Sequence, residues 1–222
     1  MAGQSSPLPW EGLSRDRAVA MKQAAILVDI RRCVGCHACG VACKTENDVP
    51  LGGFRIRTHY VQRPDKPTFA FVPMMCQHCK DAPCIPACPN EAIERLPDGR
   101  VDINKAKCKS DTACMDACPY GAIYVDPQTE KADKCNLCTQ RTEVGLQPAC
   151  VEACPTEALR FGDMGAEDSE VARLAAAHKA VAMKPDAKTN PAVRYIGLEA
   201  YMQDQAKGIQ LGKGENGVLY EQ

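Results

Sequence analysis

The spacing of the cysteines constrains this chain more than any other feature. The sequence holds 15 cysteines in 222 residues, and they form four groups that each close with a C-x3-C step. The groups are Cys33, Cys36, Cys39 and Cys43; Cys76, Cys79, Cys84 and Cys88; Cys108, Cys114 and Cys118; and Cys135, Cys138, Cys150 and Cys154. A proline follows the final cysteine in three of them. A regular repeat with an odd total indicates metal ligation rather than disulfides.

This spacing suits iron–sulfur clusters. A cubane cluster needs thiolates at the corners of a small tetrahedron, and a C-x2-C-x2-C loop can wrap around three of them. The fourth cysteine lies about one helical turn further on, so it points away and binds the other cluster of a pair. Zinc is the alternative, because C-x2-C pairs also form zinc knuckles in small binding modules. Zinc sites do not require the third and fourth cysteines, so the pattern favours iron–sulfur.

The third group lacks one cysteine. Counting from Cys108 by the usual step reaches Asp111, which occupies the position of the second ligand. Asp111 is either a polar replacement for a lost ligand, or the sign of a modified cluster, in which its carboxylate binds iron weakly or the cluster is [3Fe–4S]. We favour an effect on function, because a missing thiolate changes the cluster whatever replaces it.

Other side chains near the motifs are interpreted as supporting residues. His37 and His78 occupy variable positions beside complete sets of cysteines, which is typical of loop residues or hydrogen-bond donors to cluster sulfur. Bound clusters would leave the protein with excess negative charge. Backbone amides and cations such as Lys107, Lys109 and Lys134 would have to offset it.

The composition argues against several classes of partner. Lys and Arg total 27 against 28 Asp and Glu, so the formal charge of −1 gives no reason to expect a nucleic-acid partner. No stretch approaches the roughly 18–20 apolar residues of a membrane helix. Residues 1–20 lack the apolar region of a secretory signal. We therefore expect neither a signal peptide nor a transmembrane helix, and no catalytic motif stands out.

Short strands alternate with the cysteine loops, which indicates an α+β fold. A strand is predicted at residues 25–30, and hairpins are predicted at 58–72 and 92–103, with Asp98-Gly99 as the turn of the second. Residues 122–133 repeat the hairpin pattern.

The cysteines stop before residue 166. Asp168 or Ser169 can cap a helix that we expect to run to about Lys184, where Pro185 follows. Its apolar face would carry His178 as a packed or half-buried side chain. The tail NPAVRYIGLEAYM and the Gly-rich GKGENG are expected to be docking or loosely ordered segments.

These motifs resemble a known family. The segments CVGCHACGVACKTEN, CQHCKDAPCIPACP and KCNLCTQRTEVGLQPACVEACPTEALRFGD are similar to those of the four-cluster electron-transfer subunits of molybdenum or tungsten bis-pterin oxidoreductases. That family includes the small subunits of dimethyl-sulfoxide, polysulfide, thiosulfate, arsenate and nitrate reductases, and of sulfite and formate dehydrogenases. The likeness spans roughly residues 25–163 and the NPAVRYIG tail.

The resemblance implies two bacterial-ferredoxin-like modules related by pseudo-twofold symmetry, with inserted hairpins and a C-terminal helical extension. Residues 21–75 and 125–165 would form the first module and 76–124 the second, with extensions at 1–20 and 166–222. The implied ligand sets are Cys33, Cys36, Cys39 and Cys154; Cys43, Cys135, Cys138 and Cys150; Cys76, Cys79, Cys84 and Cys118; and Cys88, Cys108 and Cys114 with Asp111. Three clusters would be [4Fe–4S], and the last [3Fe–4S] or an Asp-ligated [4Fe–4S].

The implied function is electron transfer. The chain would pass single electrons between a large molybdopterin catalytic subunit and a quinone-reactive membrane subunit, and would be membrane-associated through the latter. A free polyferredoxin or hydrogenase-linked carrier is the alternative. The sequence predicts no substrate site in the chain itself.

Overall fold

A computed structural model describes residues 21–205, 212–213 and 219–220. Its strands are β1 (Ala24–Asp29), β2 (Ile56–Gln62), β3 (Phe69–Met75), β4 (Ile93–Arg95), β5 (Val101–Ile103), β6 (Tyr124–Val125), β7 (Ala132–Asp133), β8 (Leu159–Asp163), β9 (Arg194–Ile196), β10 (Gly212–Lys213) and β11 (Leu219–Tyr220). Its α-helices are α1 (Ala38–Glu46), α2 (Cys84–Ala87), α3 (Ala113–Asp116), α4 (Thr139–Thr142), α5 (Ala149–Glu152), α6 (Glu170–Ala177) and α7 (Ala200–Gln205). Two 3₁₀ turns are η2 (Ile30–Arg32) and η3 (Pro185–Ala187).

A small sheet joins the two ends of the described chain. Its order is β8-β1-β9, with β1 antiparallel to β8 and parallel to β9. The sequence of β1, AAILVD, is almost wholly apolar, and its first five residues are buried. Such a run is typical of a central strand covered on both faces. The strand predicted at residues 25–30 is therefore present.

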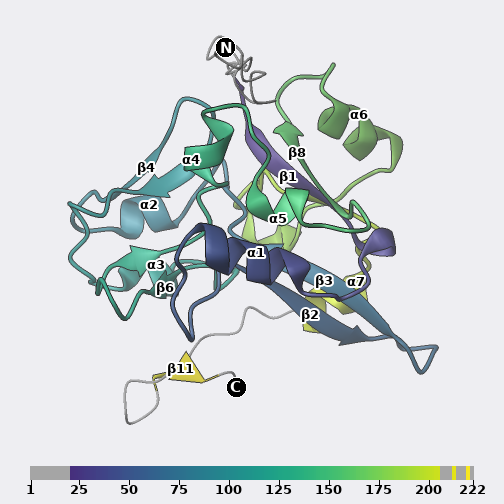
Figure 1. Ribbon diagram of the computed structural model, residues 1–222, viewed down its shortest axis with the longest axis horizontal. Coiled ribbons are helices and arrows are strands. Elements are labelled where there is room, and N and C mark those ends of the chain that lie inside the picture. Colours follow the sequence, from purple (N-terminus) through teal and green to yellow (C-terminus); the bar gives the residue numbers. More distant parts are fainter. Residues whose placement is uncertain (1–20, 206–211, 214–218, 221–222) are drawn as a thin grey trace, which may run out of the picture.

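The predicted hairpins are present as separate two-stranded sheets. β2 pairs with β3, β4 with β5, and β6 with β7, all antiparallel. In Figure 1 the β2–β3 hairpin extends to the lower right, while α2, α3, β4 and β6 lie on the left. These observations confirm a mixed α and β fold.

The helix after the cysteine motifs is shorter than predicted. Ser169 caps α6 by accepting the backbone N–H of Ala172, as expected, but the helix ends at Ala177 rather than near Lys184. Lys179 adopts a left-handed φ of 50°, and the N–H of Ala180 donates to the carbonyl of Ala175 at 2.8 Å. This is a Schellman closure with lysine in the place glycine usually takes, so the usual stop signal is missing from the sequence.

Two expectations about the C-terminal part are revised: His178 is not packed, and the tail, expected to be a docking or loosely ordered segment, is not loosely ordered at residues 194–196. His178 caps the shortened helix and is exposed, rather than packed or half-buried. The tail is ordered at residues 194–196, because β9 is a strand of the central sheet and Tyr195 is fully buried. Most of the GKGENG segment lies outside the described residues.

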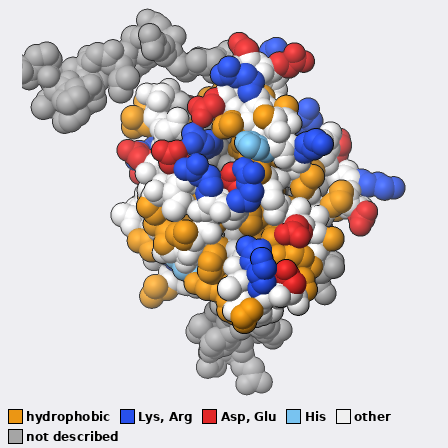
Figure 2. All heavy atoms as spheres, turned by 90° about the vertical axis from the view of Figure 1, so that its right-hand side faces the viewer, with side chains coloured by type: hydrophobic (Ala, Val, Ile, Leu, Met, Phe, Trp, Pro, Cys, Tyr) orange, Lys and Arg blue, Asp and Glu red, His pale blue; other side chains and the backbone are white. Residues whose placement is uncertain are grey.

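The surface carries apolar and basic regions. Figure 2 shows basic side chains gathered around a histidine in the upper half of one face and apolar side chains in its lower half. The exposed apolar residues of the described chain include Val34, Val41, Leu51, Tyr60 and Phe69. No helix of the described residues has the length and apolar character needed to span a membrane.

Asp163 anchors the start of the sheet by hydrogen bonds to the backbone beside β1. Its carboxylate accepts the backbone N–H groups of Lys22, Gln23 and Gly165, each at 2.8 Å. Burial acts to raise the pKa of Asp163, but these three donors outweigh burial and leave that pKa lowered. The stabilisation is complete above the ordinary carboxyl pKa and is lost as the pH falls through the lower folded-state value.

We expect Asp163→Asn to destabilise the protein by about 2 kcal/mol, because an amide cannot accept three charge-assisted hydrogen bonds. The midpoint of anaerobic thermal unfolding at pH 7 should fall by about 4–8 °C. The exposed Asp168→Asn is the control and should leave the midpoint unchanged. Equal midpoints for both variants would contradict the anchoring role.

Candidate metal centres

Helices α1 and α5 pack against each other, and the cysteines in and beside them fall into two sets of thiols. The first set is Cys33, Cys36, Cys39 and Cys154, and the second set is Cys43, Cys135, Cys138 and Cys150. Burial raises the pKa of Cys33, and Cys39, Cys154 and Cys36 raise it further. Burial likewise raises the pKa of Cys150, with added repulsion from Cys135, Cys43 and Cys138. Cys39 of the first set also acts on Cys150, so the two sets lie close to each other.

Helices α2 and α3 form a second packed pair of the same kind. The third set is Cys76, Cys79, Cys84 and Cys118, and the fourth set is Cys88, Cys108 and Cys114. Burial raises the pKa of Cys84 to about 12, and Cys76, Cys118 and Cys79 contribute. Burial raises the pKa of Cys114 to about 11, with contributions from Cys88 and Cys108. Within each helix pair, cysteines four residues apart belong to different sets.

Asp111 lies with the fourth set. It lines one cavity together with Cys88, Cys108 and Cys114, and its carboxylate accepts a hydrogen bond from the amide of Asn90. Its backbone surroundings repeat those of Cys36. Left-handed residues stand on both sides of each, Gly35 and His37 in one case and Ser110 and Thr112 in the other. Asp111 therefore has the same backbone position in its loop as Cys36 has in the first.

The described residues contain no three His, Cys, Asp or Glu side chains that converge closely enough to hold a single metal ion. Four thiols around one zinc ion would stand roughly 4 Å apart, given Zn–S bonds of about 2.3 Å. In a cubane each thiolate binds a different iron atom, which spaces the sulfurs more widely.

Three motifs end in the same local structure, which brings a backbone donor to sulfur. The sequence C-P-x-x-A occurs at Cys88, Cys118 and Cys154, and its fourth residue is left-handed in each case, at Glu91, Gly121 and Glu157. This turn directs the alanine N–H back to the cysteine, at 3.3 Å from Ala92 to Cys88 Sγ and 3.2 Å from Ala158 to Cys154 Sγ. Ala122 donates to Cys118 in the same way. Such donors stabilise a thiolate and fit a cluster ligand.

Cys154 shows the effect of these donors. Burial acts to raise its pKa, but the backbone N–H groups of Leu159, Ala158 and Thr156 and the Thr156 hydroxyl leave that pKa lowered. At buried thiols such as Cys43 and Cys150 the pKa is raised instead, because burial dominates there. A lowered value indicates a sulfur that is already disposed to be a thiolate.

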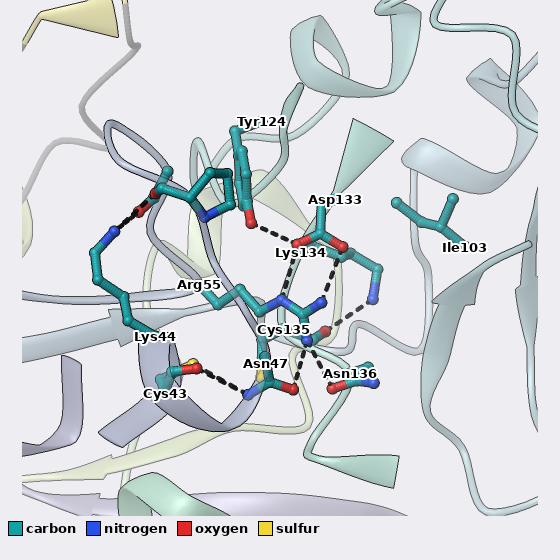
Figure 3. Close-up of polar contacts among 12 residues, drawn as sticks. Cys43, Lys44, Asn47, Arg55, Ile103, Tyr124, Asp133, Lys134, Cys135 and Asn136 are labelled. Atoms are coloured by element: carbon teal, nitrogen blue, oxygen red, sulfur yellow. Dashed lines mark hydrogen bonds and ion pairs between the residues drawn. The ribbon is translucent and has the colours of Figure 1, made fainter. Parts of the chain in front are cut away.

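A polar network supports the second set (Figure 3). The amide of Asn47 lies 3.7 Å from both Cys43 Sγ and Cys138 Sγ, and its oxygen accepts from Arg55 at 2.9 Å. Arg55 also donates twice to Asp133, whose carboxylate accepts from Tyr124 at 2.5 Å as well. Arg55 therefore fixes the amide that faces the two sulfurs. Nothing in the cysteine spacing identified Arg55 or Asn47.

The C-terminal tail supports the third set. Thr189 donates a hydrogen bond toward Cys79 and lies 2.5 Å from the hydroxyl of Tyr120. Backbone N–H groups of Lys80 and Asp81 donate to the carbonyls of Asn190 and Thr189. The sequence pattern does not reveal Thr189 and Asn190, because they stand more than 100 positions from the loop of Cys79 that they support.

The supporting residues proposed from the sequence differ in burial and in hydrogen-bond partners. His37 is exposed, stacks on Tyr60 and lies 2.8 Å from its hydroxyl. His78 is fully buried, and its Nδ1 accepts the N–H of Val101 at 3.1 Å. Among the three lysines, Lys107 and Lys109 are exposed, whereas Lys134 is buried.

Comparison with known proteins supports iron–sulfur clusters in this chain. A family model described as a 4Fe-4S dicluster domain matches residues 67–164. A tetrathionate reductase subunit of Salmonella typhimurium is 38% identical over 200 residues, which cover 87% of this chain and 78% of the relative. This protein belongs to the iron–sulfur electron-transfer subunits of the molybdoenzyme family.

Two further relatives are covered almost completely. The thiosulfate reductase electron transfer subunit of Salmonella typhi is 39% identical over 190 residues, 83% of this chain and 97% of the relative. A component of the polysulfide reductase of Wolinella succinogenes is 38% identical over 176 residues, 77% of this chain and 92% of the relative. Family membership supports [4Fe–4S] clusters over zinc, and the electron-transfer subunit over the free carrier.

The helix geometry predicts which cluster each cysteine of α1 serves. Cys43→Ser should perturb the cluster of Cys135, Cys138 and Cys150, because a hard hydroxyl is a poor substitute for a thiolate at one corner. Cys39→Ser, one turn earlier, should perturb the cluster of the first set instead. Low-temperature EPR of the reduced protein distinguishes them. The grouping is wrong if both variants alter the same signal.

Proposed function

We propose that the chain carries single electrons through four iron–sulfur clusters, between a molybdopterin catalytic subunit and a quinone-reactive membrane subunit. The observation that carries the proposal is the distribution of burial. All four thiols of the second set are buried, as are three of the four in the third set. Cys36 in the first set is exposed, and so is Asp111 beside the fourth set. A series of redox centres that receives electrons at one surface and releases them at another needs such an arrangement.

The four thiol sets support the ligand assignment that the resemblance implies. Each set would hold one cluster, and Asp111 would stand at the open corner of the fourth. When bound, the clusters supply one-electron redox chemistry. The chain itself holds the sulfurs apart and excludes water from the second and third sets, which are the inner sets. It also directs N–H groups at Cys88, Cys118 and Cys154. These roles require no proton or group transfer by the protein.

The paired helices also support two ferredoxin-like modules related by pseudo-twofold symmetry. We propose that residues 21–75 and 125–165 form one module, and residues 76–124 the other. The α1–α5 pair would serve the first module and the α2–α3 pair the second. The segments 1–20 and 166–222 would be extensions, of which the second contacts the third thiol set through Thr189.

The nature of the partners is inferred from the relatives. The names of the compared proteins describe parts of tetrathionate, thiosulfate and polysulfide reductases. We therefore propose that a catalytic subunit docks near the exposed Cys36, where Val34, Val41 and Tyr60 offer exposed apolar area. The protein would be held at the membrane by a second partner at the end that carries Asp111.

Iron content tests the central proposal. Anaerobic purification from the native host should yield about 15 or 16 iron atoms per chain, depending on whether the fourth cluster has three or four. A large molybdenum-containing subunit should remain bound. Stoichiometric zinc without iron would overturn the cluster assignment, and iron without any partner would support a free carrier instead.

Asp111 tests the fourth cluster. A carboxylate is harder than a thiolate and holds cluster iron less firmly, so that corner should be labile. We expect the oxidised protein as isolated to show a [3Fe–4S] EPR signal, and Asp111→Cys to remove it by restoring a fourth thiolate. The matched control is Asp116→Cys, a substitution at an exposed aspartate on α3. An unchanged spectrum in Asp111→Cys would show that residue 111 does not face the cluster.

A further inference from the structure

Within the described residues, Lys134 is a buried cation that forms no ion pair with a carboxylate. It directly precedes Cys135 of the second thiol set, and it is 2% exposed. The other buried lysine or arginine of the described chain is Arg100, which pairs with Asp98 at 2.5 Å. The neighbouring Asp133 binds Arg55 and Lys105 instead. Figure 3 shows Lys134 reaching the carbonyl of Cys135, apart from the contacts of Asp133 with Arg55 and Tyr124.

The hydrogen bonds of Lys134 connect the loops of two thiol sets. Its ammonium donates to the carbonyl of Val101 and to that of Cys135, the latter at 3.0 Å. The N–H of Val101 in turn donates to His78, which stands between Cys76 and Cys79 of the third set. Lys134 therefore lies where the loop of the second set meets the loop of the third.

The thiols around Lys134 come from both sets. Burial raises the pKa of Cys84, Cys118 and Cys135, and the charge of Lys134 acts in the opposite direction at each of them. Cys76 and Cys135 also repel each other, so the two sets approach each other here. Burial, followed by the charges of Lys134, Arg100 and Arg95, holds the pKa of His78 well below its ordinary value. Lys134 therefore acts on the loop of the third set as well as on that of the second.

An unpaired buried ammonium is costly unless negative charge faces it, and two carbonyl dipoles offset only part of that cost. Thiolate-ligated clusters are anionic and gain one negative charge on reduction. Lys134 would therefore stabilise the reduced form more than the oxidised form.

We propose that Lys134 is the shared positive charge that raises the reduction potentials of both the second-set and the third-set clusters, where the two modules meet. This inference rests on the proposed function, because it requires both clusters. Electron transfer would oxidise one cluster and reduce its neighbour, and it would require no proton or group transfer by the chain.

The test is an EPR-monitored redox titration of the holoprotein. Lys134→Met removes the charge while keeping a flexible buried side chain. We expect the equilibrium constant for one-electron reduction to fall about tenfold at two of the four clusters, which corresponds to about 59 mV for one electron. The first-set and fourth-set clusters should keep their potentials. The signals are assigned with the Cys43→Ser variant and with Cys84→Ser.

Two further variants separate charge from hydrogen bonding. Lys134→Gln can still donate to a carbonyl but is neutral, so it should reproduce the shift, whereas Lys134→Arg should keep the parental potentials. Lys131→Met is the matched control, because Lys131 donates to the carbonyl of Cys108 in the fourth set. It should leave the second and third clusters unchanged.

Three results would overturn the inference: unchanged potentials in Lys134→Met, parental potentials in Lys134→Gln, or a uniform shift of all four clusters. Each is read on protein with parental iron content. Loss of iron in the unmodified chain would instead contradict the proposed function itself, so the two failures are distinguishable.

Discussion

The burial of the cysteine thiols is the constraint on which the rest of the structure depends. Burial raises the pKa of Cys43 and Cys84 to about 12, and that of Cys79 to about 11. These groups are neutral thiols at neutral pH unless iron draws off their protons, since only the thiolate is a metal ligand. The free energy needed to form thiolates in a poorly solvated interior must therefore come from cluster binding. Folding and cluster insertion are coupled in such a site.

The backbone then lowers the cost of the buried negative charge. Left-handed residues at Gly35, His78, Ser110 and Leu137 bend each loop around its sulfurs, and only one of these four is glycine. A non-glycine residue in this conformation is strained, and it persists where the surrounding structure determines it. The same device recurs at the C-P-x-x-A turns, where it directs an N–H at sulfur. The strained left-handed residues thus place backbone N–H groups where they stabilise the cysteine thiolates.

The sequence predicted what depends on local pattern and missed what depends on distant contacts. The strand at 25–30 is present because a continuous apolar run determines it, and the hairpins are present because alternation and turn residues determine them locally. The end of α6 was misplaced, because Lys179 adopts the left-handed conformation without the glycine that usually marks it. The order of the tail is not predictable locally, because it comes from pairing with β1 and from the hydrogen bond of Asp81 to the carbonyl of Thr189, which are distant in sequence. Asn47, Arg55 and Thr189 belong to no motif, so only the folded chain reveals that they support the thiols.

The inner and outer thiol sets are controlled by different physical effects. Around the buried second and third sets the surroundings are fixed, so the buried charge of Lys134 and the amide of Asn47 act with little screening by water. At Cys36 and Asp111 the solvent screens fixed charges, and a docked partner would replace that solvent. The potentials at the two ends should therefore respond to assembly, whereas those in the middle should be properties of this chain. Such a division would let the same inner pair of clusters serve partners of different chemistry at the two ends.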